Sequence, residues 1–435
     1  MKKSIFIGLL LLVPIALMAQ YFGRNKVSYE KFPFKVLETP HFEIHHYLED
    51  MALTKYWGHQ SECWYASHQN LLWDTLGRKN PLILYNNHAD FQQTRAISGR
   101  ISIGTGGVTE ALKNRVLMPF TMSYQQSNHV LGHELVHAFQ YNMILRGDST
   151  NLSNLANLPL WMVEGMAEYL SIGRIDPHTA MWMRDAYLQE RLPSIRDLNN
   201  YSKFFPYRYG QLFWSYMTGR YGDEIMNPLF ISTAKVGLNR ALDSLLGIRE
   251  PELSQEWLAY LNDYYGWQLL GRSEAPIGQQ LISEKNAGRM NLSPALSPNG
   301  RYLIFYSEKD LFSVDLFLAE ARTGRILRKV ASTLKDQQID DFQYIESSGS
   351  WSPDGTRFVF VTIQKGQNYL MIKDVFSGKT ADAIRLKEVP AIANPAWSPD
   401  GKSILFSGLV KGQTDLFLLD LQSREVKQLT NDTYS

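Results

Sequence analysis

The sequence has little cysteine, no clustered charge and no apolar run long enough to cross a bilayer. Its single cysteine, Cys63, excludes an internal disulfide, so packed cores must hold the fold together. Cys63 lies in an apolar helical pattern, which predicts a small buried side chain. The net charge of +1, without a basic block, gives no reason to expect a nucleic-acid partner.

Apolar residues, by contrast, are abundant. A hydrophobic content of 44% and an aromatic content of 12% indicate packed globular domains, and 435 residues leave room for two or three of them. Residues 1–19 read as a signal peptide, because Lys2 and Lys3 precede an apolar stretch and Ala19 offers a cleavage site. We therefore expect an exported protein, periplasmic, envelope-associated or secreted, with no transmembrane span in the mature chain. A retained anchor is the alternative.

Residues 133–137 read His-Glu-Leu-Val-His, an H-E-x-x-H pattern. On a helix, His133 and His137 lie one turn apart on the same face and can reach one metal ion, while Glu134 can reach a water beside it. The alternative is a surface helix with incidental histidines, but the neighbouring residues are too apolar for a solvated helix. His129 continues the row, yet it lies about 12 Å along the helix from His137, too far for both to bind one ion. We expect it to support the site instead.

A two-histidine site needs a third protein ligand. The candidate is Glu164, in a run from 160 to 170 that also reads as a helix with an apolar face. Glu168 lies one turn later and projects the same way. Two glutamates on an apolar helix are costly to bury unless they are paired or bind metal. Two solvated carboxylates are the alternative.

An H-E-x-x-H motif followed by a helix reading W-x-x-E-G-x-A-E-Y resembles the gluzincin metallopeptidases, the thermolysin-like group. That resemblance implies a Zn²⁺ cofactor held by His133, His137 and Glu164, with Glu134 as general base and Glu168 orienting the first histidine. It also implies a polypeptide substrate. The segment between His137 and Glu164 is longer than in many members, and its polar residues 147–157 predict a surface loop.

The segments before the motif predict a mixed α/β region. Residues 34–39 and 41–47 alternate like half-buried strands, residues 49–76 read as a helix, and residues 81–85 as a short apolar strand. The glycine-rich residues 101–109 predict an extended strand beside the metal, with unpaired backbone facing the cleft. The histidines outside the motif read as ordinary surface or strand residues.

Residues 204–210 predict a turn that leads into a helix over 211–221. Two tyrosines, Tyr207 and Tyr209, lie in this turn. A phenol near a metal can donate a hydrogen bond to the oxyanion of a tetrahedral intermediate. The gluzincin resemblance suggests a tyrosine in that role, for which Tyr209 is the choice, while core packing by both rings remains open.

From about residue 273 the sequence repeats itself. Three related turns, beginning at Ser297, Ser352 and Ser398, are each followed by an alternating strand and are separated by 55 and 46 residues. Such spacing predicts one four-stranded blade per repeat. The repeats resemble TolB-like β-propellers. A β-sandwich with coincidental turns is the alternative.

Together these observations predict a signal peptide (1–19), an α+β gluzincin-like domain with a mixed sheet and active-site helices (20–272), and all-β propeller blades (273–435). The expected activity is zinc-dependent peptide hydrolysis, with a protein partner for the propeller as a further expectation. A non-catalytic scaffold with a vestigial or structural metal site is one alternative, and an aminopeptidase is another. Only three repeat turns are present, so we expect an open arc of two to three blades and a native chain that continues past Ser435.

Overall fold

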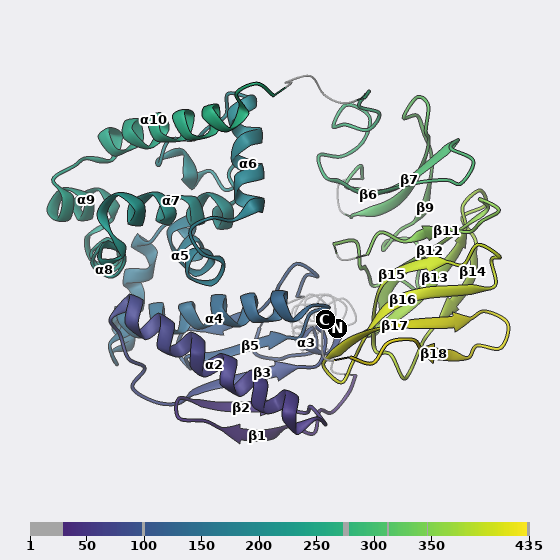
Figure 1. Ribbon diagram of the computed structural model, residues 1–435, viewed down its shortest axis with the longest axis horizontal. Helices are drawn as coiled ribbons and strands as arrows, with labels where there is room; N and C mark the ends of the chain where they lie inside the picture. Colours follow the sequence, from purple (N-terminus) through teal and green to yellow (C-terminus); the bar gives the residue numbers. More distant parts are fainter. Residues whose placement is uncertain (1–28, 98–100, 273–277, 311–312, 346, 433–435) are drawn as a thin grey trace, which may run out of the picture.

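The computed structural model describes residues 29–97, 101–272, 278–310, 313–345 and 347–432. The predicted signal peptide lies outside these residues. Within them, no helix combines the length and the apolar character needed to cross a membrane. Helices and several separate sheets make up the fold, as the sequence predicts (Figure 1).

The first part contains a mixed five-stranded sheet, in the order β1 (Lys35–Glu38), β2 (Phe42–His46), β3 (Asn80–Tyr85), β5 (Arg115–Pro119) and β4 (Val108–Glu110). The strands β2, β3 and β5 run parallel, and the two edge strands are antiparallel to their neighbours. The predicted extended strand over 101–109 is wrong for most of its length, because only β4 pairs and residues 101–107 form turns and irregular backbone.

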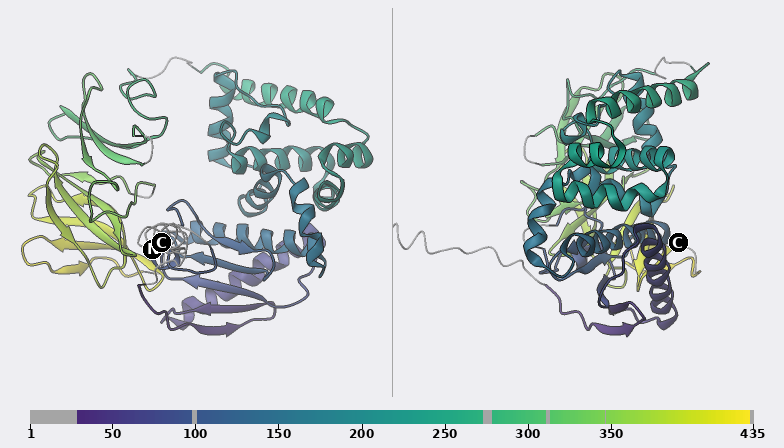
Figure 2. Two further views of the ribbon diagram at one scale, coloured as in Figure 1. Left: turned by 180° about the vertical axis from the view of Figure 1, so that it is seen from behind. Right: turned by 90° about the vertical axis from the view of Figure 1, so that its left-hand side faces the viewer.

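Helices α2 (Met51–Leu72) and α4 (Tyr124–Leu145) lie across one face of this sheet (Figures 1 and 2). Cys63 is exposed on α2, so the prediction of a buried cysteine is wrong. His68 on the same helix is fully buried, which corrects its reading as a surface or strand residue. A short helix, α3 (His88–Phe91), follows β3.

The remaining helices stack on the side of α4 that faces away from the sheet (Figure 1). They are α5 (Leu160–Ile172), α6 (Pro177–Leu188), α7 (Pro206–Tyr221), α8 (Met226–Val236), α9 (Leu238–Leu246) and α10 (Glu250–Leu269). The polar segment before α5 lies on the surface, as predicted, but forms the 3-10 helix η1 (Ser149–Asn157). The predicted turn over 204–210 is also wrong, because α7 already begins at Pro206, whose fixed φ suits the first helical turn.

Two glycines allow α5 and α7 to cross closely. A Cβ on Gly165 would lie 2.2 Å from the backbone of Gly210, and one on Gly210 would lie 1.9 Å from the carbonyl oxygen of Trp161. Side chains at either position would therefore push the helices apart. This crossing fixes the start of α7 relative to α5 and hence relative to Glu164.

Three antiparallel sheets follow. Their strands are β6 (Asn291–Leu296), β7 (Tyr302–Ser307), β8 (Asp315–Glu320) and β9 (Ile326–Ala331); then β10 (Asp341–Phe342), β11 (Ser350–Trp351), β12 (Arg357–Gln364), β13 (Gln367–Asp374) and β14 (Thr380–Ile384); then β15 (Ala391–Trp397), β16 (Ser403–Val410), β17 (Gln413–Asp420) and β18 (Val426–Gln428). The first and third sheets have four strands in chain order, which confirms the predicted four-stranded repeat; the second has a fifth, short strand.

The three repeat turns share one geometry. In each, the glycine amide donates to the serine carbonyl at 2.9 Å, and the glycine has a positive φ of 68–72°. A Cβ on Gly355 would touch Pro298 and one on Gly401 would touch Pro353, so each turn lies against the turn of the preceding repeat. The repeat in the sequence is thus a repeat in space.

Candidate metal centre

The candidate site lies where α4 meets α5. Ser123 caps α4 by accepting a hydrogen bond from the Gln126 amide, and Gly132 lets the ring of Trp64 pack directly on the helix backbone. His133 and His137 are both 8% exposed, which places them inside the protein and excludes an incidental surface pair.

The structure brings His133, His137 and Glu164 together. The two Nε2 atoms lie 3.2 Å apart, and Glu164 Oε2 lies 3.3 Å from each of them. A tetrahedral zinc site with bonds of about 2.0–2.1 Å places neighbouring ligand atoms about 3.3–3.4 Å apart. The three atoms therefore form a face of suitable size for zinc.

A polar side chain lies at the far side of each ring, beside Nδ1, and leaves Nε2 toward this triangle. Gln140 Nε2 donates to the Val163 carbonyl at 3.0 Å, so Gln140 Oε1 accepts from His137 Nδ1 at 2.8 Å. Glu168 Oε1 lies 3.1 Å from His133 Nδ1. When the two rings are neutral and carry their proton on Nδ1, both Nε2 lone pairs face a carboxylate oxygen, an arrangement that fits a cation.

Glu168 lies in a wider charged network. Its Oε1 is also 3.3 Å from His129 Nε2, and its Oε2 is 3.3 Å from Arg208 Nη1. Arg208 Nη1 in turn lies 3.2 Å from Asp176 Oδ2. His129, His133 and Glu168 could themselves hold an ion, but Arg208 already neutralises that carboxylate. The triangle with Glu164 is therefore the better candidate for a metal, and His129 contacts it only through Glu168.

The charges of this cluster shift its pKa values. Burial alone would lower the pKa of His133, but Glu164, Glu168 and Glu134 outweigh it and raise this pKa to about 10. Burial alone would raise the pKa of Glu164, but hydrogen bonds and charge from His133 and His137 lower it well below its usual range. Both shifts show that the carboxylates favour a positive charge at the histidine rings, whether a proton or a bound cation carries it.

Glu134 is buried beside the triangle. Its Oε2 accepts a hydrogen bond from Thr109 Oγ1 at 2.8 Å, and that hydroxyl lies equally close to the Glu134 carbonyl oxygen. A Cβ on Gly107 would lie 2.7 Å from the Glu134 side chain. The segment before β4 therefore lies against the predicted general base, although not as the strand that the sequence predicts.

The structure places Tyr207, and not the chosen Tyr209, against the ring of His133. The Tyr207 ring stacks on His133 with centroids 5.8 Å apart. Tyr209 instead contacts Phe204 and turns away from the site. Two residues apart on a helix point in nearly opposite directions, so the early start of α7 decides between them. Burial, followed by the charges of Glu164 and Glu134, raises the pKa of Tyr207, which keeps its phenol a donor.

Sequence reasoning missed three residues that shape the site, Gln140, Thr109 and Arg208, and it considered Tyr207 but preferred Tyr209. Pro206 is a signal for a helix start and could have placed Tyr207 and Arg208 on α7. The spacing of Gln140 three residues after His137 is a weaker signal of contact on one helix. Nothing near Thr109 in the sequence indicates its partner 25 residues away.

Comparisons with known proteins show no family for this chain. No protein-family model matches the sequence, and no curated protein matches it. Among solved structures it is similar to TolB from Acinetobacter baumannii, with 20% identity, 37% of this chain and 36% of that chain covered, and a TM-score of 0.29. It is also similar to a putative TolB from Agrobacterium tumefaciens (21% identity, 34% and 49% covered, TM-score 0.28) and to the β-propeller domain of the Trilobed protease from Pyrococcus furiosus (15% identity, 33% and 43% covered, TM-score 0.25). The chain spans between a third and a half of these structures, and at such TM-scores they carry no argument about its activity.

Proposed function

We propose that this chain is a zinc-dependent peptidase. The observation that carries the proposal is the triangle of His133 Nε2, His137 Nε2 and Glu164 Oε2, with sides of 3.2–3.3 Å, directly beside Glu134. A purely structural zinc site would have four protein ligands and no need of a base. Three protein ligands and an adjacent carboxylate are the arrangement of a hydrolytic site.

Each residue has a separate task in this proposal. Zinc, when bound, supplies polarisation of the scissile carbonyl and a more acidic water. Glu134 takes the proton of that water and delivers it to the leaving amine, while Thr109 holds the orientation of its carboxylate. Tyr207 donates a hydrogen bond to the oxyanion. Glu168 and Gln140 orient the rings of His133 and His137.

The test compares wild-type protein with Glu134→Gln and His137→Ala. Zinc content is measured by mass spectrometry and hydrolysis by a proteome-derived peptide cleavage profile. We expect Glu134→Gln to keep stoichiometric zinc and lose cleavage, and His137→Ala to lose both. His59→Ala, an exposed histidine on α2, is the control. Stoichiometric zinc in His137→Ala would refute the ligand set, and a zinc-loaded wild type inert to the whole peptide pool would favour a non-catalytic scaffold.

The same assay separates two kinds of peptidase. Matched peptides with free and N-acetylated amino termini distinguish an endopeptidase, which cleaves both, from an aminopeptidase, which cleaves only the free form. Export to the periplasm or beyond, supported by the pattern of residues 1–19, belongs to this proposal. So does the role of the three C-terminal sheets as propeller blades that bind a protein partner, which the repeated turns support.

A further inference from the structure

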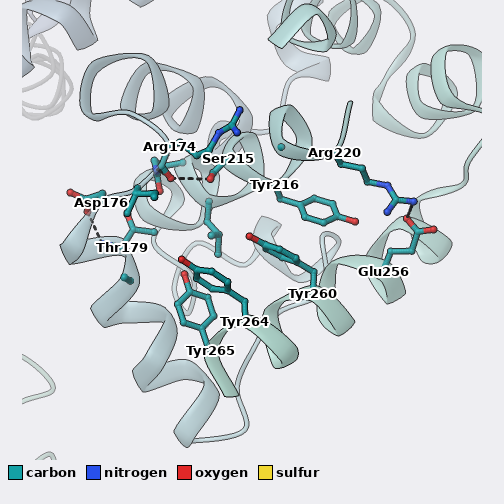
Figure 3. A pocket seen from close by; sticks show the side chains of 15 residues that line it. Arg174, Asp176, Thr179, Ser215, Tyr216, Arg220, Glu256, Tyr260, Tyr264 and Tyr265 are labelled. Carbon is teal, nitrogen blue, oxygen red and sulfur yellow. Dashed lines mark hydrogen bonds and ion pairs between the residues drawn. The ribbon is translucent and has the colours of Figure 1, made fainter. Parts of the chain in front are cut away.

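A second cavity lies away from the histidine cluster, between the start of α6, the middle of α7 and α10 (Figure 3). Its volume is about 510 Å³, which is within the range of small-molecule sites. None of the three proposed zinc ligands lines it, nor does Glu134 or Tyr207. Asp176, which lines the cavity, also contacts Arg208 and so belongs to the charged network around Glu168.

Hydroxyl groups and aromatic rings dominate its lining. Six hydroxyl-bearing side chains contribute: Thr179, Ser215, Tyr216, Tyr260, Tyr264 and Tyr265. The rings of Tyr260 and Tyr264 stack at 15° with centroids 5.7 Å apart, and the ring of Tyr216 lies 5.2 Å from that of Tyr260. Figure 3 shows these rings side by side along one wall. Tyr260 and Tyr264 are 42% and 38% exposed, so their surfaces are open to a ligand.

Two of these hydroxyls are buried without a partner. Thr179 is 2% exposed and Tyr216 is 6% exposed, and neither hydroxyl oxygen has a hydrogen-bond partner among the described residues. A buried hydroxyl without a partner costs about 1–3 kcal/mol. Both oxygens have almost no accessible surface, so a ligand in the cavity would meet the tyrosine rings and the more exposed hydroxyls instead.

The charges around the cavity are already paired. Arg220 lies 2.8 Å from Glu256, Arg174 lies 3.6 Å from Asp223, and Asp176 is held by Arg208. A free anion would have to compete with these carboxylates, so the cavity is not built for phosphate or sulfate. An extended peptide is disfavoured too, because the main walls are helices whose backbone groups already bond within the helix.

We propose that this cavity binds an uncharged sugar. A pyranose ring presents C–H faces that pack on phenol rings, and its hydroxyls both donate and accept, as do the hydroxyls of the exposed Tyr260 and Tyr264. The volume accommodates one or two sugar rings. Sugar binding at this cavity does not require the proposed peptidase activity. It would attach the protein to a glycan, and the zinc site would remain free for its own substrate.

The test uses the full chain with zinc bound, titrated with cellobiose, chitobiose and maltose. Binding is followed by saturation-transfer NMR and calorimetry. We expect at least one disaccharide to bind wild type, and the double variant Tyr260→Ala/Tyr264→Ala to weaken that binding at least tenfold. Tyr260→Phe, which keeps the ring, should weaken it less. Tyr56→Ala, at a tyrosine on α2 that is 41% exposed, is the matched control and should bind like wild type.

Zinc content and circular dichroism, unchanged in the double variant, show that it is folded. Sugar binding that persists undiminished in Tyr260→Ala/Tyr264→Ala would overturn the proposal. So would the absence of binding to all three disaccharides, or saturable binding of inorganic phosphate or a tripeptide that the double variant abolishes. None of these outcomes depends on whether peptides are cleaved.

Discussion

At the scale of single residues, the contacts of Nδ1 determine how the ring of each motif histidine is oriented. Gln140 Oε1 and Glu168 Oε1 face the two Nδ1 atoms, and this leaves both Nε2 atoms for the metal. Gln140 is 1% exposed and its amide cannot turn without losing the Val163 carbonyl. Its contribution is therefore to ring orientation and not to contact with a substrate.

Replacing Gln140 tests that contribution. Gln140→Ala should lower zinc affinity about 10–100-fold, the usual effect of losing a partner behind a metal ligand. Gln140→Glu keeps an acceptor for His137 Nδ1 but loses the donor to the Val163 carbonyl, so it should retain only part of the affinity and fall between wild type and Gln140→Ala. Competition with a fluorescent chelator measures both, and Gln125→Ala, exposed on the same helix, is the control. An affinity unchanged in Gln140→Ala would show that the ring is held by packing alone.

Tyr207 carries a separate prediction. Tyr207→Phe removes the phenol donor but keeps the ring stacked on His133, so zinc content and KM should stay near wild type. The kcat should fall about 10²-fold, the order seen when one oxyanion donor is lost. Tyr209→Phe, two residues along α7 and turned away, should leave kcat unchanged. The opposite result for the two variants would restore Tyr209 to the role that the sequence suggested.

His68 makes the fold sensitive to acid. Its Nε2 lies 2.9 Å from the Gly132 carbonyl, and burial lowers its pKa to about 4, although that hydrogen bond opposes the shift. Below the unfolded value of about 6.5, the unfolded chain takes up a proton that the folded chain refuses. His68 therefore contributes stability above pH 6.5 that is lost as the pH falls toward 4, up to about 3 kcal/mol.

Urea unfolding of the zinc-free protein between pH 7 and 4 measures this loss. In His68→Gln, which can still donate to Gly132, the free energy of unfolding should fall less steeply over the same range. Identical pH slopes for the two proteins would mean that His68 is protonated in the fold.

At the scale of helices, the crossing of α5 and α7 controls the distance between Glu164 and Tyr207. Gly210→Ala places a methyl group against the Trp161 carbonyl, where only backbone movement can make room. We expect a loss of about 1–3 kcal/mol in unfolding free energy, together with weaker zinc binding. Gly219→Ala lies on the same helix with open space around it and should stabilise by about 0.5–1 kcal/mol. Equal effects at the two glycines, measured by urea unfolding, would contradict this account of the crossing.

The helices also show which parts of the fold and of the candidate site could be predicted from the sequence. The helical period places the proposed ligands His133 and His137 on one face of a helix, whereas Glu164 lies on a second helix and was chosen with the help of the gluzincin resemblance. The order of the repeats follows from their turns. The choice of Tyr209 over Tyr207 depended on the start of α7, which the sequence placed five residues too late. Once both tyrosines lie on the helix, they point in nearly opposite directions around its axis. Thr109 and Asp176 depend on tertiary contacts that no local pattern contains. Of the predicted strand over 101–109 only its end pairs; Gly107, before that end, approaches the Glu134 side chain closely.

At the scale of the whole molecule, the C-terminal sheets are joined to the first part through a shared core. Ala391 and Leu409 belong to the same apolar cluster as Leu48 and Phe120. At the hairpin between β16 and β17, a Cβ on Gly412 would lie 2.8 Å from Leu48 and 2.9 Å from Leu53. Gln367 donates to Glu30 across the same boundary. The two parts are therefore expected to unfold together.

Gly412→Ala tests this joint. Gly412 and Gly300 both have positive φ, 86° and 68°, so alanine carries a similar backbone cost at each. Only Gly412 has neighbours, so Gly412→Ala should lose about 1–3 kcal/mol more than Gly300→Ala in chemical unfolding. Equal losses would mean that the hairpin does not rest on the first part in solution.

The metal triangle spans two helices that the chain itself connects only through the surface segment containing η1. Zinc bound as proposed would therefore cross-link α4 and α5 in addition to serving as a cofactor. At a free concentration a thousandfold above its dissociation constant, it would add roughly 4 kcal/mol to the stability of the fold. Removing zinc would then make the protein more susceptible to proteolysis and would also abolish the proposed peptidase activity. The amount of folded protein would then depend on the local zinc supply.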